Sequence, residues 1–279
     1  MITFVSAFYI LKSKFSKEKY EKWFSNFLVN VKKFNLVIFC NNESKPLLEK
    51  YTNGNKNIKL VIFNIEEFYN YKYKKNWITN HEKNNLLNQD STKSGMGSHK
   101  TVWELNMLWS EKISFVKNAK ENKYFPETDW YGWCDIGYFR GEALGDIPHN
   151  NIQKWPNENK IVSLDKNKIY YALVRNDQNY LQYLYNLINK KNEKGLPSTP
   201  IPPDQWSIAG GFFVIYKENI CNWHKMYDDK LKLYFENNYL VKDDQIIIID
   251  NIMSKFNLFQ LVVENTYSNP WFVFQRFLL

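Results

Sequence analysis

The sequence predicts an α/β fold, with a mostly parallel central sheet flanked by helices, in a single domain over residues 1–279. Two observations predict it. Apolar runs typical of buried strands alternate with amphipathic helical segments in the first part of the chain, which is the pattern of a parallel sheet with crossover helices. The chain is also long enough, at 279 residues with 44% hydrophobic side chains, to bury a sizeable core. The sequence shows neither an internal repeat nor a clear linker.

Three strands and two helices are expected in that first part. Runs rich in β-branched and aromatic residues predict strands at residues 2–10, 35–40 and 58–64. Apolar residues spaced by three or four positions predict a helix from Ser16 to Lys33, and Ser44 to Tyr51 is expected to form a shorter one. Because strands that alternate with helices usually pair in parallel, this order is typical of a nucleotide-binding half.

The sequence patterns in the rest of the chain are less regular. Residues 66–89 show no sustained period, so irregular structure is expected there, and a glycine-containing loop at 91–99 should lead into a helix over about 100–120. Periodicity and turn residues then predict a strand and turn at 130–140 and further strands at 161–165, 170–174, 206–216 and 258–264. Helices are expected at 178–191, at 218–238 and from 242, and the tail at 271–279 should pack back on the domain.

The charge pattern argues against a nucleic-acid reader. The formal net charge of +8 comes almost wholly from lysines, which are spread over every predicted helix among acidic residues and asparagines instead of gathering on one element. A positive balance favours, weakly, an anionic small ligand such as a phosphate ester.

Cysteine usage and hydropathy bear on location. The three cysteines, Cys40, Cys134 and Cys221, are odd in number and widely spaced, which favours a reducing compartment over a disulfide framework or a thiolate metal cluster. No stretch approaches the roughly 18 consecutive apolar residues of a membrane span, and the first residues lack the basic flank and cleavage site of a signal peptide. We therefore expect a cytoplasmic protein without a transmembrane segment.

A single acid ends the apolar run that starts at Trp130. Asp135 follows this run and precedes a glycine and Arg140, one of only three arginines. A buried strand that ends on an acid delivers a charged group to the crevice at the carboxyl edge of an α/β sheet, so Asp135 is a candidate ligand-binding residue. The alternative is a strand that leaves the core through a solvated Asp and a glycine turn.

Two glycines interrupt a strongly apolar strand. Gly210 and Gly211 lie within the run 206–216. Glycine weakens a strand, so the pair indicates that something approaches the backbone closely. A sugar or a phosphate is one candidate, and tight packing or a β-bulge is the other.

Two adjacent carboxylates open the last long helix. Asp243 and Asp244 lie at its expected start, where the positive end of the helix favours negative charge. A helix start alone would explain them. The pair is also a candidate for an acid in a cleft, because catalytic acids and bases are often carried at the ends of elements.

Read in order, these landmarks resemble a known family. They are Thr3–Tyr9, the Tyr20/Trp23/Phe24 helix, Val37–Phe39, the Asn106/Trp109/Lys112 helix, Trp133–Gly137, Gly210–Phe213 and Asp243–Gln245. The layout looks like the HtrL/YibB (WlaTC-like) group of bacterial and giant-virus proteins, which are similar to glycosyltransferases of the GT-A fold. The resemblance covers nearly the whole chain through short landmarks.

The resemblance implies a single Rossmann-like GT-A domain that binds a nucleotide sugar, with a nucleotide-binding half at about 1–140 and a sugar and acceptor half at about 141–279. The residues it implies as donor contacts are Ala7, Phe8 and Tyr9 for the base, Asn106, Trp109 and Lys112 for the diphosphate or ribose, and Gly210 and Gly211 for the sugar. Asp243 or Asp244 would lie near the reacting carbon. Asp244 would be the general base of an inverting mechanism, whereas a retaining mechanism needs no such base.

The resemblance also implies a divalent cation, Mg²⁺ or Mn²⁺, held by Asp135 and bridging the two phosphates. The usual motif is Asp-x-Asp, but its third position here is Gly137, so one carboxylate stands where two are typical. A further ligand such as His224 or Asp165 would then be needed, or Arg140 would partly replace the charge of the metal. A surface ion pair is the more ordinary role for Arg140.

We therefore expect a glycosyltransferase that moves a sugar from a nucleotide-diphosphate sugar, with UDP-hexose or UDP-N-acetylhexosamine as first choice, to a glycan or protein acceptor. One alternative is a nucleotidyltransferase, although these usually carry a glycine- and basic-rich loop directly after the first strand, unlike residues 7–12 here. The other is a non-catalytic carbohydrate or protein binder, because aromatic faces stack on sugars and dominate interfaces.

Overall fold

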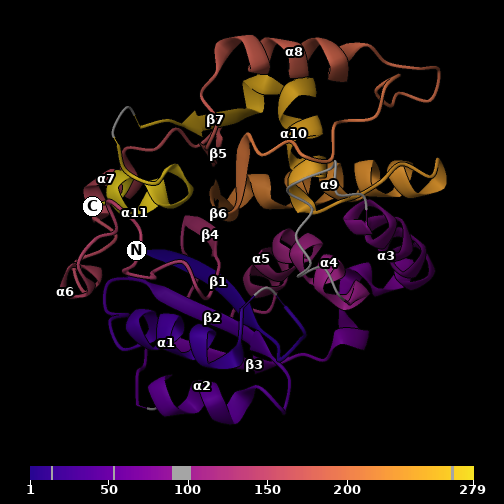
Figure 1. The fold of residues 1–279 in the computed structure, drawn as a ribbon. Coiled ribbons are helices and arrows are strands. Elements are labelled where there is room, and N and C mark those ends of the chain that lie inside the picture. Colours follow the sequence, from indigo (N-terminus) through magenta and orange to yellow (C-terminus); the bar gives the residue numbers. More distant parts are fainter. Residues whose placement is uncertain (14, 53, 90–101, 265–266) are drawn as a thin grey trace.

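The structure is a computed structural model that describes residues 1–279 except 14, 53, 90–101 and 265–266. The described residues form a seven-stranded sheet with the order β3-β2-β1-β4-β6-β5-β7 (Figure 1). The strands are β1 (Ile2–Phe8), β2 (Asn35–Cys40), β3 (Ile58–Ile62), β4 (Trp130–Cys134), β5 (Ile169–Leu173), β6 (Ile208–Tyr216) and β7 (Phe259–Val262). Neighbouring strands run parallel except where β6 pairs with β4 and β5. The predicted α/β fold with a mostly parallel sheet is confirmed.

The strand order reverses beside β1. From β1 the chain builds outward through β2 to β3 and then returns to place β4 on the other side of β1. In open α/β sheets such a reversal leaves a crevice at the carboxyl ends of the two central strands, where ligands bind. Here those ends are Phe8 of β1 and Cys134 of β4. Since β6 is antiparallel to β4, with Phe212 opposite Cys134, the first residues of β6 reach the same edge.

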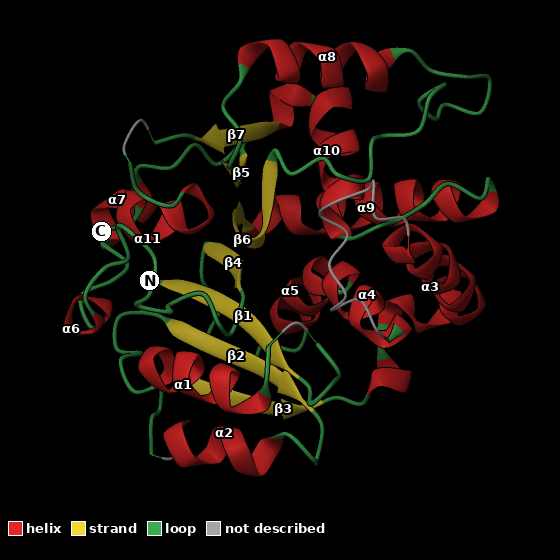
Figure 2. Cartoon of the chain, viewed as in Figure 1, coloured by secondary structure: helices red, strands yellow, loops and turns green. Residues whose placement is uncertain are grey.

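Helices cover both faces of the sheet (Figure 2). Alternate side chains of β1 enter two separate cores, Phe4 and Phe8 on one face and Val5 and Ala7 on the other, as the period of two in a strand requires. The first core is completed by α1 (Lys17–Leu28), α2 (Lys45–Thr52) and α11 (Val273–Phe277), and the second by α5 (Lys112–Glu121), α8 (Gln178–Asn189), α9 (Ile220–Glu236) and α10 (Asp244–Ser254). Each large side chain that these helices bury contributes about 1.5–3 kcal/mol of transfer free energy.

The remaining elements are short or peripheral. They are α3 (Lys74–Gln89), α4 (Trp103–Ser110), α6 (His149–Ile152), α7 (Glu158–Val162), and the 3-10 turns η1 (Ile65–Glu67), η2 (Tyr69–Tyr73), η3 (Lys217–Asn219), η4 (Phe256–Leu258) and η5 (Pro270–Phe272). In the described part of the chain, no helix combines the length and the apolar character that crossing a membrane requires.

Two segments differ from their predictions. Residues 66–89, expected to be irregular, form η1, η2 and the helix α3. Helix α3 packs through Trp77 and two buried asparagines, Asn80 and Asn84, so it lacks the apolar stripe by which a helix is recognised. The run 161–165, expected to be a strand, lies partly in α7. Asn157 caps α7 by accepting a hydrogen bond from the backbone N–H of Asn159. Periodicity does not tell a strand from a helix in so short an apolar run, and this cap favours the helix.

Most other predicted elements agree with the structure to within a few residues, and the C-terminal tail packs back on the sheet through Phe274 and Leu278, both fully buried. The helix expected over 100–120 consists of α4 and α5, with Glu111 between them. The loop expected at 91–99 lies outside the described residues.

Candidate active site

A cleft lies at the carboxyl edge of the sheet, where the strand order reverses. It consists of two adjoining pockets. Both pockets are lined by Phe15, Tyr20, Trp109, Lys112, Asp135, Gly137 and Arg140. The first extends along the end of β1, and the second extends over the start of β6 and the start of α10. The cleft therefore occupies the position at which a doubly wound sheet binds its ligands.

Lys112 is the polar centre of this cleft. Its ammonium nitrogen lies 2.8 Å from the carbonyl oxygen of Gly210 and 2.9 Å from Oδ2 of Asp244. Oδ1 of Asp135 is 3.5 Å away, close enough for an ion pair but longer than a hydrogen bond. The side chain is only 10% exposed. The two carboxylates hold the lysine charged, because their attraction outweighs its desolvation and raises the pKa of Lys112.

Asp135 leaves the end of β4 and faces the cleft. Its backbone N–H donates to the carbonyl of Gly211 and so continues the β4–β6 ladder by one residue. The indole N–H of Trp133 donates to Oδ1 over 2.6 Å, which fixes the carboxylate in direction. The side chain is 45% exposed, so Asp135 is the accessible carboxylate beside Lys112.

Asp244 is the buried carboxylate of the same cluster. It is the first residue of α10 and its side chain is 6% exposed. Burial raises the pKa of Asp244 to about 6, and the negative charges of Asp243 and Asp135 add to this rise, while Lys112 opposes it. Asp243 occupies the N-cap position of α10, so the expected helix start is confirmed, and both acids line the second pocket.

The glycines of β6 give the two carboxylates their space. A methyl group at Gly210 would lie 2.6 Å from Oδ2 of Asp244, and one at Gly211 would lie 3.0 Å from Oδ2 of Asp135. The pairing of β5 with β6 shifts at this point, from Tyr171 opposite Phe213 to Ala172 opposite Ala209, so the glycines lie in a bulge of β6. The groups that approach the backbone of these glycines include the two carboxylates and, at the carbonyl of Gly210, the ammonium of Lys112.

The end of β1 and the residue that follows it form one wall of the first pocket. Ala7, Phe8 and Tyr9 line it, and the hydroxyl of Tyr9 donates to the carbonyl of Phe63. Trp109 lines both pockets. With Lys112, five of the residues with implied donor contacts therefore line the first pocket.

Asn106 lies elsewhere. It is almost fully buried and lines neither pocket, although the resemblance implies a contact with the donor. Its side-chain amide donates to the carbonyl of Lys242 over 3.1 Å. The position of Asn106 therefore fits a role in holding the chain that leads into Asp243 and Asp244.

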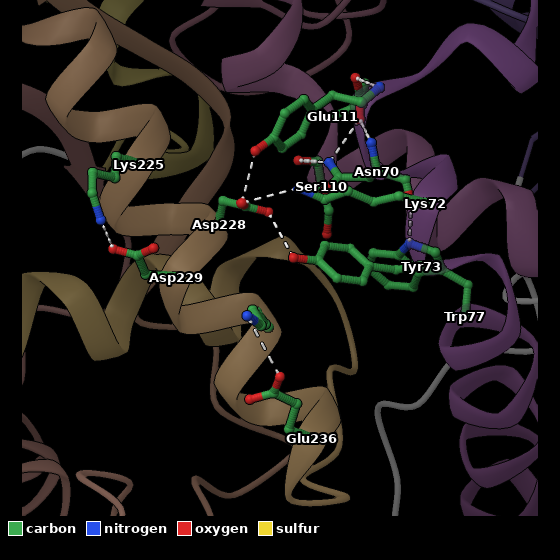
Figure 3. Close-up of polar contacts among 12 residues, drawn as sticks. Asn70, Lys72, Tyr73, Trp77, Ser110, Glu111, Lys225, Asp228, Asp229 and Glu236 are labelled. Carbon is green, nitrogen blue, oxygen red and sulfur yellow. Dashed lines mark hydrogen bonds and ion pairs between the residues drawn. The ribbon is translucent and has the colours of Figure 1, made fainter.

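Glu111 was not recognised from the sequence. It is buried between α4 and α5, where its carboxylate accepts the backbone N–H groups of Tyr69 and Asn70 and the side-chain amide of Asn70 (Figure 3). Burial raises the pKa of Glu111 to about 8. Figure 3 also shows Asp228 of α9 accepting from Lys72 and Tyr73, so η2 is fixed at both ends.

These contacts matter for the cleft because Glu111 immediately precedes Lys112. Anchoring Glu111 sets where α5 begins and thereby where the Lys112 side chain enters the cleft. A signal was present in the sequence, since a carboxylate directly beside an apolar helical stripe needs buried partners. Those partners are about forty residues away in the chain, which a helical pattern does not show.

Arg140 is enclosed by aromatic rings. Its guanidinium lies 4.2 Å from the ring centroid of Trp23 and 5.1 Å from that of Phe272, and its Nε donates to the carbonyl of Gly137. Guanidinium groups stack well on aromatic faces. Arg140 thus lines both pockets, and with the described residues it does not form the surface ion pair that was its ordinary alternative.

The residues of the cleft do not fit the implied divalent cation. Among the described residues, no group of three or more His, Cys, Asp or Glu side chains is placed to hold a metal ion. His224 lines a different pocket beside Tyr69 and Glu111, and Asp165 caps the turn before β5, where it accepts from Asn167. Neither supplies the second ligand considered for Asp135. The gap between Asp135 and Asp244 holds the Lys112 ammonium instead.

Comparison with known proteins gives fold neighbours only. No protein-family model and no curated protein matches the chain, so the resemblance to the HtrL/YibB group stays a prediction. Mouse xyloside xylosyltransferase 1, in its apo form, aligns over 93% of this chain and 84% of its own at 14% identity, with a TM-score of 0.46. Galactosyltransferase LgtC, in complex with donor and acceptor sugar analogues, aligns over 89% of this chain and 69% of its own at 11% identity, with a TM-score of 0.42. Since both TM-scores are below 0.5, the function proposed below is based on the geometry of the cleft.

Proposed function

We propose that the chain is a GT-A-type glycosyltransferase that transfers a sugar from a nucleoside-diphosphate sugar to a glycan or protein acceptor. The observation that carries the proposal is the meeting of Lys112, Asp135 and Asp244 at the strand-order reversal, in a cleft with two pockets. One pocket suits a nucleoside and the other a sugar and its acceptor. A nucleotide half at about 1–140 and an acceptor half at about 141–279 would each contribute to this cleft.

The first pocket has the properties of a nucleoside site. Ala7, Phe8 and Tyr9 offer a largely apolar wall to a base, while the ammonium of Lys112 and the guanidinium of Arg140 lie where the pocket joins the second one. Lys112 has three N–H donors, of which two are used at 2.8 and 2.9 Å. Since Oδ1 of Asp135 is 3.5 Å from this nitrogen, longer than a hydrogen bond, we assign the third donor to a diphosphate oxygen. UDP-hexose and UDP-N-acetylhexosamine are the donors to test first.

The second pocket suits the acceptor and the chemistry. Trp206 and Trp271 line it, and aromatic faces stack on sugar rings. In the proposed reaction the acceptor hydroxyl oxygen bonds to the anomeric carbon, the bond from that carbon to the diphosphate oxygen breaks, and the diphosphate leaves with the electron pair. Asp244 takes the hydroxyl proton. A buried carboxylate with a pKa of about 6 is ionised at neutral pH and matched to this task in an inverting displacement.

A ligand screen by thermal unfolding tests the proposal. A donor at a hundred times its dissociation constant adds about 2.7 kcal/mol to the free energy of unfolding, which raises the melting temperature by several degrees. We expect this for a uridine-diphosphate sugar with the wild type and a smaller rise with Lys112→Met, which removes the N–H donor assigned to the diphosphate. Release of the nucleoside diphosphate, measured with a panel of glycans and peptides, then identifies the acceptor class.

The same screen separates the other functions. Stabilisation by nucleoside triphosphates but by no nucleotide sugar would replace the proposal with a nucleotidyltransferase. Stabilisation by glycans alone would replace it with a carbohydrate-binding protein. Lys117→Met is the matched control for Lys112→Met, because Lys117 is a lysine of the same helix, paired with Glu121 and outside both pockets.

A further inference from the structure

We propose that the Lys112 ammonium, and not a divalent cation, is the positive charge that Asp135 and Asp244 hold in this cleft. The part of the inference that concerns the diphosphate rests on the proposed function. The part that concerns ion binding rests on the protein alone and is tested on it. The site would then be independent of divalent metal ions, in contrast to the cation that the GT-A resemblance implies.

The distances place the lysine where a bridging ion would lie. Its nitrogen is 2.9 Å from Oδ2 of Asp244 and 3.5 Å from Oδ1 of Asp135. A Mg²⁺ ion requires oxygen ligands at about 2.0–2.1 Å in an octahedral arrangement. An ion that joined the two carboxylates at such distances would share the gap with a buried ammonium group, and the two positive charges would repel each other.

The lysine is also held firmly in this gap. The carbonyl of Gly210 accepts a hydrogen bond from it at 2.8 Å, and the side chain is 10% exposed. Glu111, the residue before it, is fixed by the backbone of Tyr69 and Asn70. Moving Lys112 aside would leave a buried carbonyl and a buried carboxylate without this donor, so an arriving ion gains no easy access.

The cationic side chains that line the cleft outnumber the anionic ones without a metal ion. Among the described residues that line the two pockets, the cationic side chains are Lys17, Lys112, Arg140 and Lys242, and the anionic ones are Asp135, Asp243 and Asp244. The cleft therefore carries a slight positive excess. Lysine and arginine donors can take up the charge of a leaving diphosphate, as fixed charges that need no reorganisation.

The substitution that removes the lysine makes the inference testable. In Lys112→Met the carboxylates of Asp135 and Asp244 keep their positions but lose the ammonium between them. Two carboxylates facing one gap are a binding site for a hard cation. We therefore expect this variant to gain Mn²⁺ binding that the wild type lacks.

Electron paramagnetic resonance of free Mn²⁺ measures this directly, in the full chain, with and without UDP. Without UDP, the wild type should leave the free Mn²⁺ signal unchanged. With UDP, the wild type and Asp135→Asn should lower the signal by the same amount. Lys112→Met should bind Mn²⁺ about tenfold or more tightly than the wild type. The matched control is Lys117→Met, which removes a lysine of the same helix that pairs with the single carboxylate of Glu121 and should behave as the wild type.

Wild-type binding of Mn²⁺ that Asp135→Asn abolishes, with or without UDP, would overturn the inference. So would a folded Lys112→Met variant that gains no Mn²⁺ binding. If that variant fails to fold, the comparison of the wild type with Asp135→Asn still decides. A failure of the proposed function is seen separately, because it would appear as a lack of stabilisation by nucleotide sugars and would leave the Mn²⁺ measurement unaffected.

Discussion

The bulge glycines allow a sharp test of how the site is built. Gly210→Ala places a methyl carbon 2.6 Å from Oδ2 of Asp244 and 3.0 Å from its Cγ. Neither Gly210 nor Gly211 has a positive φ, so alanine is compatible with the backbone and its effect is steric. To reach an ordinary contact of 3.4 Å, the carboxylate oxygen must move by about 0.8 Å.

This movement has two expected costs. Overpacking of a buried site lowers the free energy of unfolding by about 1–3 kcal/mol. The displaced carboxylate also loses its alignment with Lys112, and a misplacement of this size lowers kcat by about 10²-fold. Gly211→Ala is the comparison variant, because its methyl group would make a milder contact, 3.0 Å from Oδ2 of Asp135, whose side chain is 45% exposed.

Denaturant unfolding and donor turnover measure the two effects. For Gly211→Ala we expect a change within about 1 kcal/mol, since the loss of unfolded-state entropy that alanine brings offsets a mild contact. Equal stability and equal kcat in the two variants would refute the reasoning, because they would show that Asp244 does not depend on the space beside Gly210.

Three further predictions concern single side chains of the cleft. Asp135→Ala should lower turnover by at least about 10²-fold while leaving the melting temperature nearly unchanged, and retained turnover would remove this residue from the mechanism. In the proposed mechanism Asp244 acts as a base only when ionised, so kcat/KM, which reports the groups of the ligand-free protein, should fall about tenfold per pH unit below pH 6. Asp244→Asn should abolish this dependence. Asp250→Asn, at a buried carboxylate of α10 that Lys191 and Lys230 hold, should lower stability and keep the pH dependence. Trp206→Ala should raise the KM for the acceptor with little change in unfolding free energy, and an unchanged KM would exclude Trp206 from the acceptor site.

The sequence was a good guide to elements with a regular pattern. The strand at 35–40 is a short apolar run and the helices of residues 178–191 and 218–238 are apolar on one side, so these elements lie where the sequence pattern predicted them. Helix α3 was not predicted, because it packs through asparagines such as Asn80, which bonds with the backbone of Val241. A polar contact of this kind leaves no period in the sequence.

The sequence indicated the residues of the candidate site better than it indicated how they are arranged. Asp135 and Asp244 were each named from a local signal and Lys112 from the family resemblance, but the ion pair of Lys112 with Asp244 joins positions 132 residues apart. One sequence contains no information on such a pair. For the same reason the lysine was expected to contact the donor, while its place between two carboxylates became visible only in the folded chain.

The direction of β6 has a consequence for how such a protein diversifies. Because β6 runs against its neighbours, the segment that precedes it, with prolines at 197, 200, 202 and 203, arrives at the edge that carries Trp206. Surface segments accept insertions and deletions far more readily than paired strands do. Selection for a different acceptor would therefore act first on residues 197–206, while the strand pairing that seats Asp135 stays untouched.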